Sequence, residues 1–73
     1  MAITYMQARQ LTIDRLQQRI NTEPESELER PQFMVGFNSY TINSMMAEVM
    51  RGTPDGRAWV NMTAKSLNYL VEV

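Results

Sequence analysis

The chain has 73 residues and a formal charge of −1, because seven Lys and Arg residues are set against eight Asp and Glu residues. It contains no cysteine and no histidine, which excludes disulfides and removes the commonest zinc ligands. The nearly balanced charge argues against binding to nucleic acid through phosphate neutralisation.

A domain of this size buries only about 60–65% of the surface that its unfolded chain exposes. We therefore expect one domain over residues 1–73 with a small core that relies on regular helix packing, self-association or a partner. No apolar run approaches the roughly 20 residues of a membrane span, and the N-terminus lacks signal-peptide features. These features, and the absence of cysteine, predict a cytoplasmic location.

A first helix is predicted over residues 5–21. Thr4 and Gln7 have the spacing of a capping box, and Ile3 and Ala8 can form a hydrophobic staple around it. Apolar residues then recur at helical spacing, at Met6, Ile13, Leu16 and Ile20.

Residues 22–31 are predicted to form an acidic, flexible linker. Glutamate occupies every second position from 23 to 29, and Pro24 and Pro31 prevent an ordinary helical continuation. Few apolar side chains are present to offset the entropy of ordering this segment.

A short hairpin is predicted after the linker, pairing residues around 33–36 with those around 39–41. Phe33, Val35 and Phe37 alternate as on the buried face of a strand, so Met34 should point the other way. The turn chemistry comes from Gly36, Asn38 and Ser39.

Two further helices are predicted around Gly52. Thr41 caps the first of them and Gly52 ends it, and its apolar stripe consists of Ile42, Met45, Met46, Val49 and Met50. Thr53 and Pro54 begin the second, which should run to about Val71. Its stripe consists of Val60, Thr63, Leu67 and Leu70, with Trp59 and Met62 at the edge.

The expected fold is therefore mainly α with a short β-hairpin, an α+β fold in the order α-β-β-α-α. Its three helices pack around a small core. The two helices around Gly52 could also be read as a helix-turn-helix. Asp55 would face phosphates unfavourably there, and Arg57, Asn61 and Lys65 are a poor set for reading bases, so a plain helical hairpin is favoured.

Little in the sequence supports catalysis. A general base would have to be a carboxylate or Lys65, and the neighbouring Ser66 points about 100° away from Lys65 on a helix. The glutamates of residues 22–31 lack the glycine and spacing of a calcium loop. We therefore expect no enzyme activity, no metal and no cofactor.

The sequence does contain candidates for protein binding: Ile3, Tyr5, Met6, Arg9 and Met34. The N-terminal stretch is more apolar than a dispensable tail needs to be, and Tyr, Met and Arg are favoured in interfaces. Residues 1–22 carry three arginines against one aspartate, a net +2, and residues 23–30 carry four glutamates against one arginine, a net −3. The seven methionines suit either a core or an adaptable binding surface.

In length, acidity, absence of Cys and His, and order of elements, the whole chain resembles small bacteriophage-encoded regulators of host RNA polymerase, such as that of a Xanthomonas phage. The resemblance involves no single motif. It implies a protein that binds the polymerase, inhibits initiation by interfering with the sigma factor, and promotes antitermination. A structural or adaptor homo-oligomer and a helix-turn-helix DNA-binding protein are the alternatives.

Overall fold

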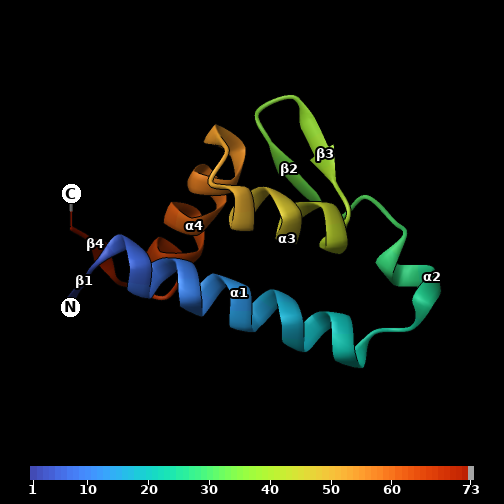
Figure 1. The fold of residues 1–73 in the computed structure, drawn as a ribbon, viewed down its shortest axis with the longest axis horizontal. Coiled ribbons are helices and arrows are strands. Elements are labelled where there is room, and N and C mark those ends of the chain that lie inside the picture. The colour runs from blue at the N-terminus through green and yellow to red at the C-terminus, as the bar shows by residue number, and fades with distance from the viewer. Residues whose placement is uncertain (73) are drawn as a thin grey trace.

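The structure is a computed structural model that describes residues 1–72. Its elements in order are β1 (Ala2–Ile3), α1 (Tyr5–Thr22), α2 (Glu25–Leu28), β2 (Phe33–Val35), β3 (Asn38–Tyr40), α3 (Ile42–Arg51), α4 (Pro54–Ser66) and β4 (Leu70–Val71). In Figure 1, α1 runs along one side of the molecule, α3 and α4 pack on it, and the β2–β3 hairpin lies beyond them. The predicted α+β fold is confirmed, with α2 and the strands β1 and β4 in addition.

Helix α1 begins with the predicted capping box, in which the Thr4 hydroxyl accepts from the Gln7 backbone and the Gln7 side chain accepts from the Thr4 backbone. Its buried face is centred on Ala8, Thr12 and Leu16. The Thr12 hydroxyl donates to the Ala8 carbonyl at 2.8 Å, so its burial leaves no unpaired donor. The small side chains of Ala8 and Thr12 let α3 and α4 pack close to α1 at these two positions.

The prediction that Met6 lies on the core stripe is therefore wrong, since 65% of its surface is exposed. Met50 of α3 is likewise 59% exposed, although its neighbours on the predicted stripe are buried. Each methionine lies at the edge of the apolar stripe on its own helix. The centre of that stripe, which is buried, is the part that faces the opposing helix.

Helices α3 and α4 start at the predicted caps, Thr41 and Thr53. They are separated at Gly52, which adopts the left-handed conformation with φ of 70° and so favours glycine. The first turn of α4 then lies directly against α3. A Cβ on Gly56 would stand only 2.1 Å from the carbonyl oxygen of Glu48.

The predicted continuation of the last helix to Val71 is wrong, because α4 ends at Ser66. Asn68 takes a positive φ of 64°, which asparagine tolerates better than most residues. The chain then forms β4, which pairs in parallel with β1 in the register Ala2↔Leu70 and Ile3↔Val71. Leu70 is exposed there instead of lying on a buried stripe.

The β2–β3 hairpin is confirmed, with Phe33 opposite Tyr40 and Val35 opposite Asn38. Phe33 is buried as predicted, and Met34 points outward. Phe37 was predicted to point inward and is fully exposed, because Gly36 and Phe37 form the turn.

Asp55 in the first turn of α4 fastens this hairpin to the helices. One of its carboxylate oxygens accepts a hydrogen bond from the Asn38 amide at 2.9 Å and another from the Tyr40 hydroxyl. The bond from Tyr40, followed by that from Asn38, lowers the pKa of Asp55. The same contact, aided by desolvation and by nearby carboxylates, raises the pKa of Tyr40 to about 12.

The core lies where α1, α3, α4 and β2 meet. Its buried hydrophobic members are Ile3, Ala8, Leu16, Phe33, Ile42, Met45, Met46, Val49, Val60 and Ala64. None of the helices within residues 1–72 combines the length and the apolar character that crossing a membrane requires.

Replacing Gly56 with alanine should destabilise the fold. Gly→Ala in a helix ordinarily stabilises by up to about 1 kcal/mol, but here the new methyl group would collide with the backbone of Glu48. We expect the free energy of unfolding to fall by roughly 1–3 kcal/mol. Urea unfolding followed by circular dichroism measures it, and Asn61→Ala, at an exposed position of the same helix, should change stability by less than about 0.5 kcal/mol. A Gly56→Ala variant as stable as the wild type would contradict the close approach.

Tyr40→Phe should destabilise the protein at neutral pH by removing the main hydrogen bond to Asp55. The pKa of Asp55 in the folded protein lies below its ordinary 3.8. The stabilisation that the ionised Asp55 gives the fold is therefore complete above pH 3.8 and is lost as pH falls through the lowered pKa. The difference in unfolding free energy between wild type and Tyr40→Phe should thus shrink in acid. Urea titrations at a series of pH values test this, and a difference that stays constant into strong acid would show that the Asp55 carboxylate is not the partner.

Candidate protein-binding surfaces

The five residues predicted to bind a partner lie in different environments. Ile3 is only 9% exposed and belongs to the core, so it is not available for contact. Tyr5 is half-buried against the same core, and its hydroxyl lacks a hydrogen-bond partner. Met6 and Arg9 lie together on α1, and Met34 is 62% exposed on the hairpin.

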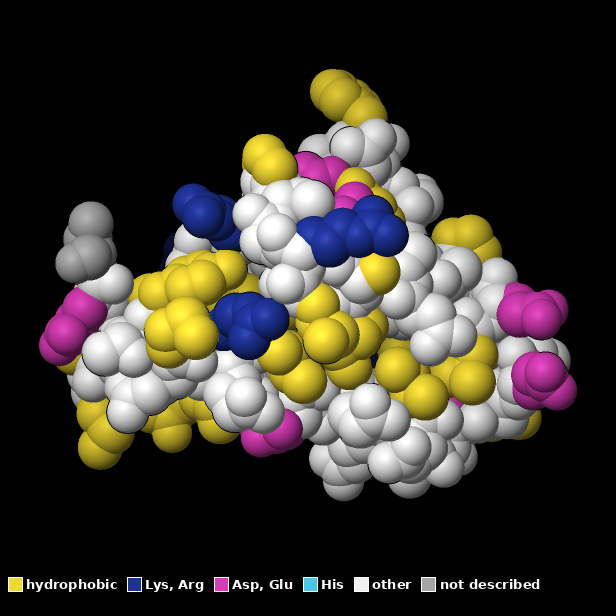
Figure 2. Space-filling model, viewed as in Figure 1, with side chains coloured by type: hydrophobic (Ala, Val, Ile, Leu, Met, Phe, Trp, Pro, Cys, Tyr) yellow, Lys and Arg dark blue, Asp and Glu magenta, His cyan; other side chains and the backbone are white. Residues whose placement is uncertain are grey.

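One apolar surface follows the line along which α1 and α3 pack. We call it the α1–α3 face and define it by Met6, Arg9, Ile13 and Met50. Met6 and Ile13 are seven positions apart and so project to the same side of α1. Figure 2 shows hydrophobic side chains gathered along this line, with a Lys or Arg side chain among them.

Arg9 joins the two helices across this face. Its guanidinium donates to the backbone carbonyl of Met50 at 3.3 Å, in the last turn of α3, where the helix dipole favours a positive charge. The result is an arginine between two exposed methionines. Both residue types are enriched in the contact regions of protein interfaces.

A groove between α1 and α4 forms a second surface, the α1–α4 groove, with a volume of about 280 Å³. It is lined by Thr12, Arg15, Leu16, Arg19, Phe33, Trp59, Met62, Thr63 and Ser66. The rings of Phe33 and Trp59 meet edge to face with their centroids 4.7 Å apart. The guanidinium of Arg19 lies 5.2 Å from the centre of the Phe33 ring, within cation–π range.

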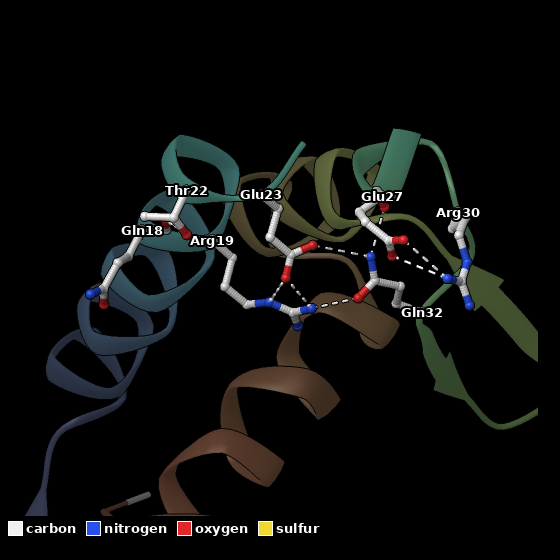
Figure 3. A network of polar contacts seen from close by, with 7 residues as sticks. All are labelled: Gln18, Arg19, Thr22, Glu23, Glu27, Arg30 and Gln32. Carbon is white, nitrogen blue, oxygen red and sulfur yellow. Dashed lines mark hydrogen bonds and ion pairs between the residues drawn. The ribbon is translucent and has the colours of Figure 1, made fainter. Parts of the chain in front are cut away.

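A polar network fixes Arg19 at the end of this groove (Figure 3). Arg19 donates to one Glu23 oxygen at 3.0 and 2.8 Å, and also to the side-chain oxygen of Gln32. The amide of Gln32 in turn donates to the backbone carbonyl of Glu27 at 2.7 Å. The bond from Arg19 holds the pKa of Glu23 below its usual range, against an opposing effect of desolvation.

This network also changes the interpretation of the acidic segment. An acidic, flexible linker was predicted over residues 22–31. The segment contains the short helix α2, and Leu28 packs against the core. Glu23 and Glu27 form ion pairs with Arg19 and Arg30. Two of the four alternating glutamates therefore have partners that their sequence pattern did not reveal, while the flexibility of the segment stays a prediction.

Sequence reasoning missed the α1–α4 groove altogether and assigned Met50 to the core. Trp59 and Met62 were placed at the edge of a helical stripe, which was the available signal for the groove. Nothing in the sequence pattern indicated that Arg15 and Arg19 would lie at this groove. Within residues 1–72, no three His, Cys, Asp or Glu side chains gather as potential metal ligands.

The chain was compared with protein-family models, with curated proteins and with solved structures, and none of them matched. A function for this protein therefore has to be argued from its own surfaces. Those surfaces are the α1–α3 face, the α1–α4 groove and the exposed hairpin.

Gln32→Ala should loosen the acidic segment, because it removes the contacts from Gln32 to Arg19 and to the Glu27 carbonyl. Losing hydrogen bonds worth about 1 kcal/mol should raise the population of the locally opened segment about fivefold. Limited digestion with a glutamate-specific protease measures this as faster cleavage between residues 23 and 29.

Gln17→Ala is the matched control, since it breaks one side-chain bond to Asn21 within α1 and leaves the network intact. It should leave the cleavage rate unchanged. Equal cleavage of wild type and Gln32→Ala would mean that Gln32 does not hold the segment.

Proposed function

We propose that this protein is a non-enzymatic regulator that binds a large protein assembly through its α1–α3 face. The observation that carries the proposal is the exposure of Met6 and Met50 on either side of Arg9. When a partner covers these exposed apolar side chains, their surface is removed from water, and this burial stabilises the complex. Methionine also adapts its shape to the surface that it contacts.

The partner that we propose is host RNA polymerase, in the cytoplasm of a bacterial cell infected by a phage. On this proposal the protein inhibits initiation and promotes antitermination. The support is the resemblance in length, acidity and order of elements to small phage-encoded regulators. The charge distribution agrees with it, because a positive α1 beside an acidic segment can orient a small protein on a large, unevenly charged surface.

The double substitution Met6→Glu and Met50→Glu should abolish this binding. Each glutamate replaces an apolar side chain that the partner would desolvate, so the affinity should fall by at least about tenfold for each. Affinity capture from a bacterial lysate, scored by mass spectrometry for polymerase subunits at stoichiometric level, measures the effect.

Gln18→Glu is the control for each glutamate, because it introduces one negative charge on an exposed position of α1 away from the face. It should leave capture unchanged. If wild type recovers no polymerase subunit, the polymerase assignment is wrong. If the double variant still captures polymerase normally, the α1–α3 face is not the binding surface.

A structural or adaptor homo-oligomer is the second candidate, and the hairpin is the observation that favours it. Phe37 is fully exposed at the turn, and Met34 is exposed beside it on β2, a strand whose only partner within residues 1–72 is β3. An unpaired strand edge with apolar side chains can accept a strand from a second copy. Light scattering at micromolar concentration discriminates, since a stable monomer counts against this candidate.

Binding of duplex DNA by α4 is disfavoured by the position of the hairpin. A recognition helix contacts bases with its N-terminal residues, and the first turn of α4 is occupied by the contacts of Asp55 with Asn38 and Tyr40.

A further inference from the structure

The α1–α4 groove lies beside α4, on a different flank of α1 from the α1–α3 face. Arg15, on the rim of the groove, and Met6 are nine positions apart, which places them about 180° apart around the helix. The groove is also small for an ordinary ligand site. Its volume of about 280 Å³ falls just below the roughly 300–1,000 Å³ typical of pockets for small molecules and cofactors.

We propose that the α1–α4 groove binds a short protein segment that carries one large apolar side chain beside one or two carboxylates. This site goes beyond the proposed function, because it lies on a different surface from the one that we propose for polymerase. It would give the protein a second docking site for a partner of defined chemistry.

The apolar part of this partner follows from the floor and wall of the groove. Leu16 and Phe33 are buried members of the core, so they form a firm base, and Trp59 packs against them half-exposed. Met62 is 50% exposed at the wall and can adapt to the shape of an inserted side chain. A single large aliphatic or aromatic side chain above this base would contact Trp59 and Met62.

The carboxylate follows from the charge on the rim. Arg19 already donates to Glu23 and Gln32. Arg15 is exposed and makes no side-chain hydrogen bond or ion pair with the rest of residues 1–72. One uncommitted positive charge therefore stands beside an apolar groove, which is the complement of an acidic residue next to an apolar anchor.

The groove is formed before any partner binds. Phe33 holds Trp59 by its edge-to-face contact, Arg19 lies over Phe33, and the Glu23–Gln32 network holds Arg19. A site that is already ordered loses little conformational entropy on binding. For that reason even a short segment with one anchor should bind measurably.

Single-stranded nucleic acid fits these surroundings less well. Binding without sequence preference needs several aromatic faces on which bases stack, together with a basic track for the phosphates. Trp59 is the one tryptophan of the chain, and it is packed against Phe33. Arg19 is already paired with Glu23, so the groove offers Arg15 as a single uncommitted cation in place of a basic track.

The test uses the intrinsic fluorescence of Trp59, which reports directly on the groove because no other tryptophan is present. The 73-residue chain is titrated with a short peptide that has a central leucine flanked by glutamates. Two matched peptides replace the leucine with alanine or the glutamates with lysines. A single-stranded oligonucleotide of similar charge is the fourth probe.

We expect the leucine–glutamate peptide to change the emission of Trp59 saturably, with an affinity that weakens as salt is added. The alanine peptide should bind about tenfold more weakly, from the lost burial of one leucine side chain. The lysine peptide and the oligonucleotide should bind more weakly still. No saturable binding of the leucine–glutamate peptide, or equal binding of the lysine peptide or the oligonucleotide, overturns the proposal.

Arg15→Glu should reduce the affinity for the leucine–glutamate peptide about tenfold and improve that for the lysine peptide. The new glutamate is four residues before Arg19, a favourable helical pair, so the variant should fold. Arg57→Glu is the control, because this exposed arginine lies on the other flank of α4, and it should leave both affinities unchanged.

Met62→Asp is a second variant, on the wall of the groove. It too should lower the affinity for the leucine–glutamate peptide. Peptide binding that neither Arg15→Glu nor Met62→Asp alters places the peptide elsewhere and overturns the proposal. Capture of polymerase should be unaffected by both variants, since the α1–α3 face is unchanged in them.

Discussion

The close approach of α3 and α4 at Gly56 is the constraint on which the rest of this structure depends. Only a hydrogen atom fits between the α4 backbone and the Glu48 carbonyl. Helices α3 and α4 meet in this tight contact, and α1 packs against both of them through its buried residues Ala8, Thr12 and Leu16. In a chain of 73 residues, one side of the 18-residue α1 is buried because the helix packs against α3 and α4 together.

The same packing explains why both of the proposed binding surfaces include residues of α1. Helix α1 buries Ala8, Thr12 and Leu16 against α3 and α4, and its two flanks remain accessible beside α3 and beside α4. The flank beside α3 combines Met6 with Arg9, and the flank beside α4 combines Arg15 with the groove around Trp59. Each pairs an arginine with apolar surface, and each is held by a fixed contact, Arg9 by the Met50 carbonyl and the groove by its aromatic pair.

The sequence predicted what is local and failed where tertiary packing decides. The caps at Thr4, Thr41 and Thr53 depend on residues three positions away, so their patterns were sufficient. Met6, Met50 and Leu70 were assigned to core stripes because they are apolar at helical spacing, but burial depends on where the opposing helices lie. The pairing of β1 with β4 joins the two ends of the described chain, and two-residue strands carry no periodicity by which such a partner could be found. The groove was missed for the same reason, since Arg15, Phe33 and Trp59 come from three separate elements.

The central claim is that the α1–α3 face is open in the free protein and covered in the complex with polymerase. Oxidation of methionine by dilute peroxide tests it directly, because the reaction rate follows exposure and mass spectrometry resolves each methionine. We predict that Met6 and Met50 oxidise quickly in the free protein and slowly in the complex, while buried Met45 reacts slowly in both. Unchanged oxidation of Met6 and Met50 in the complex would contradict the account.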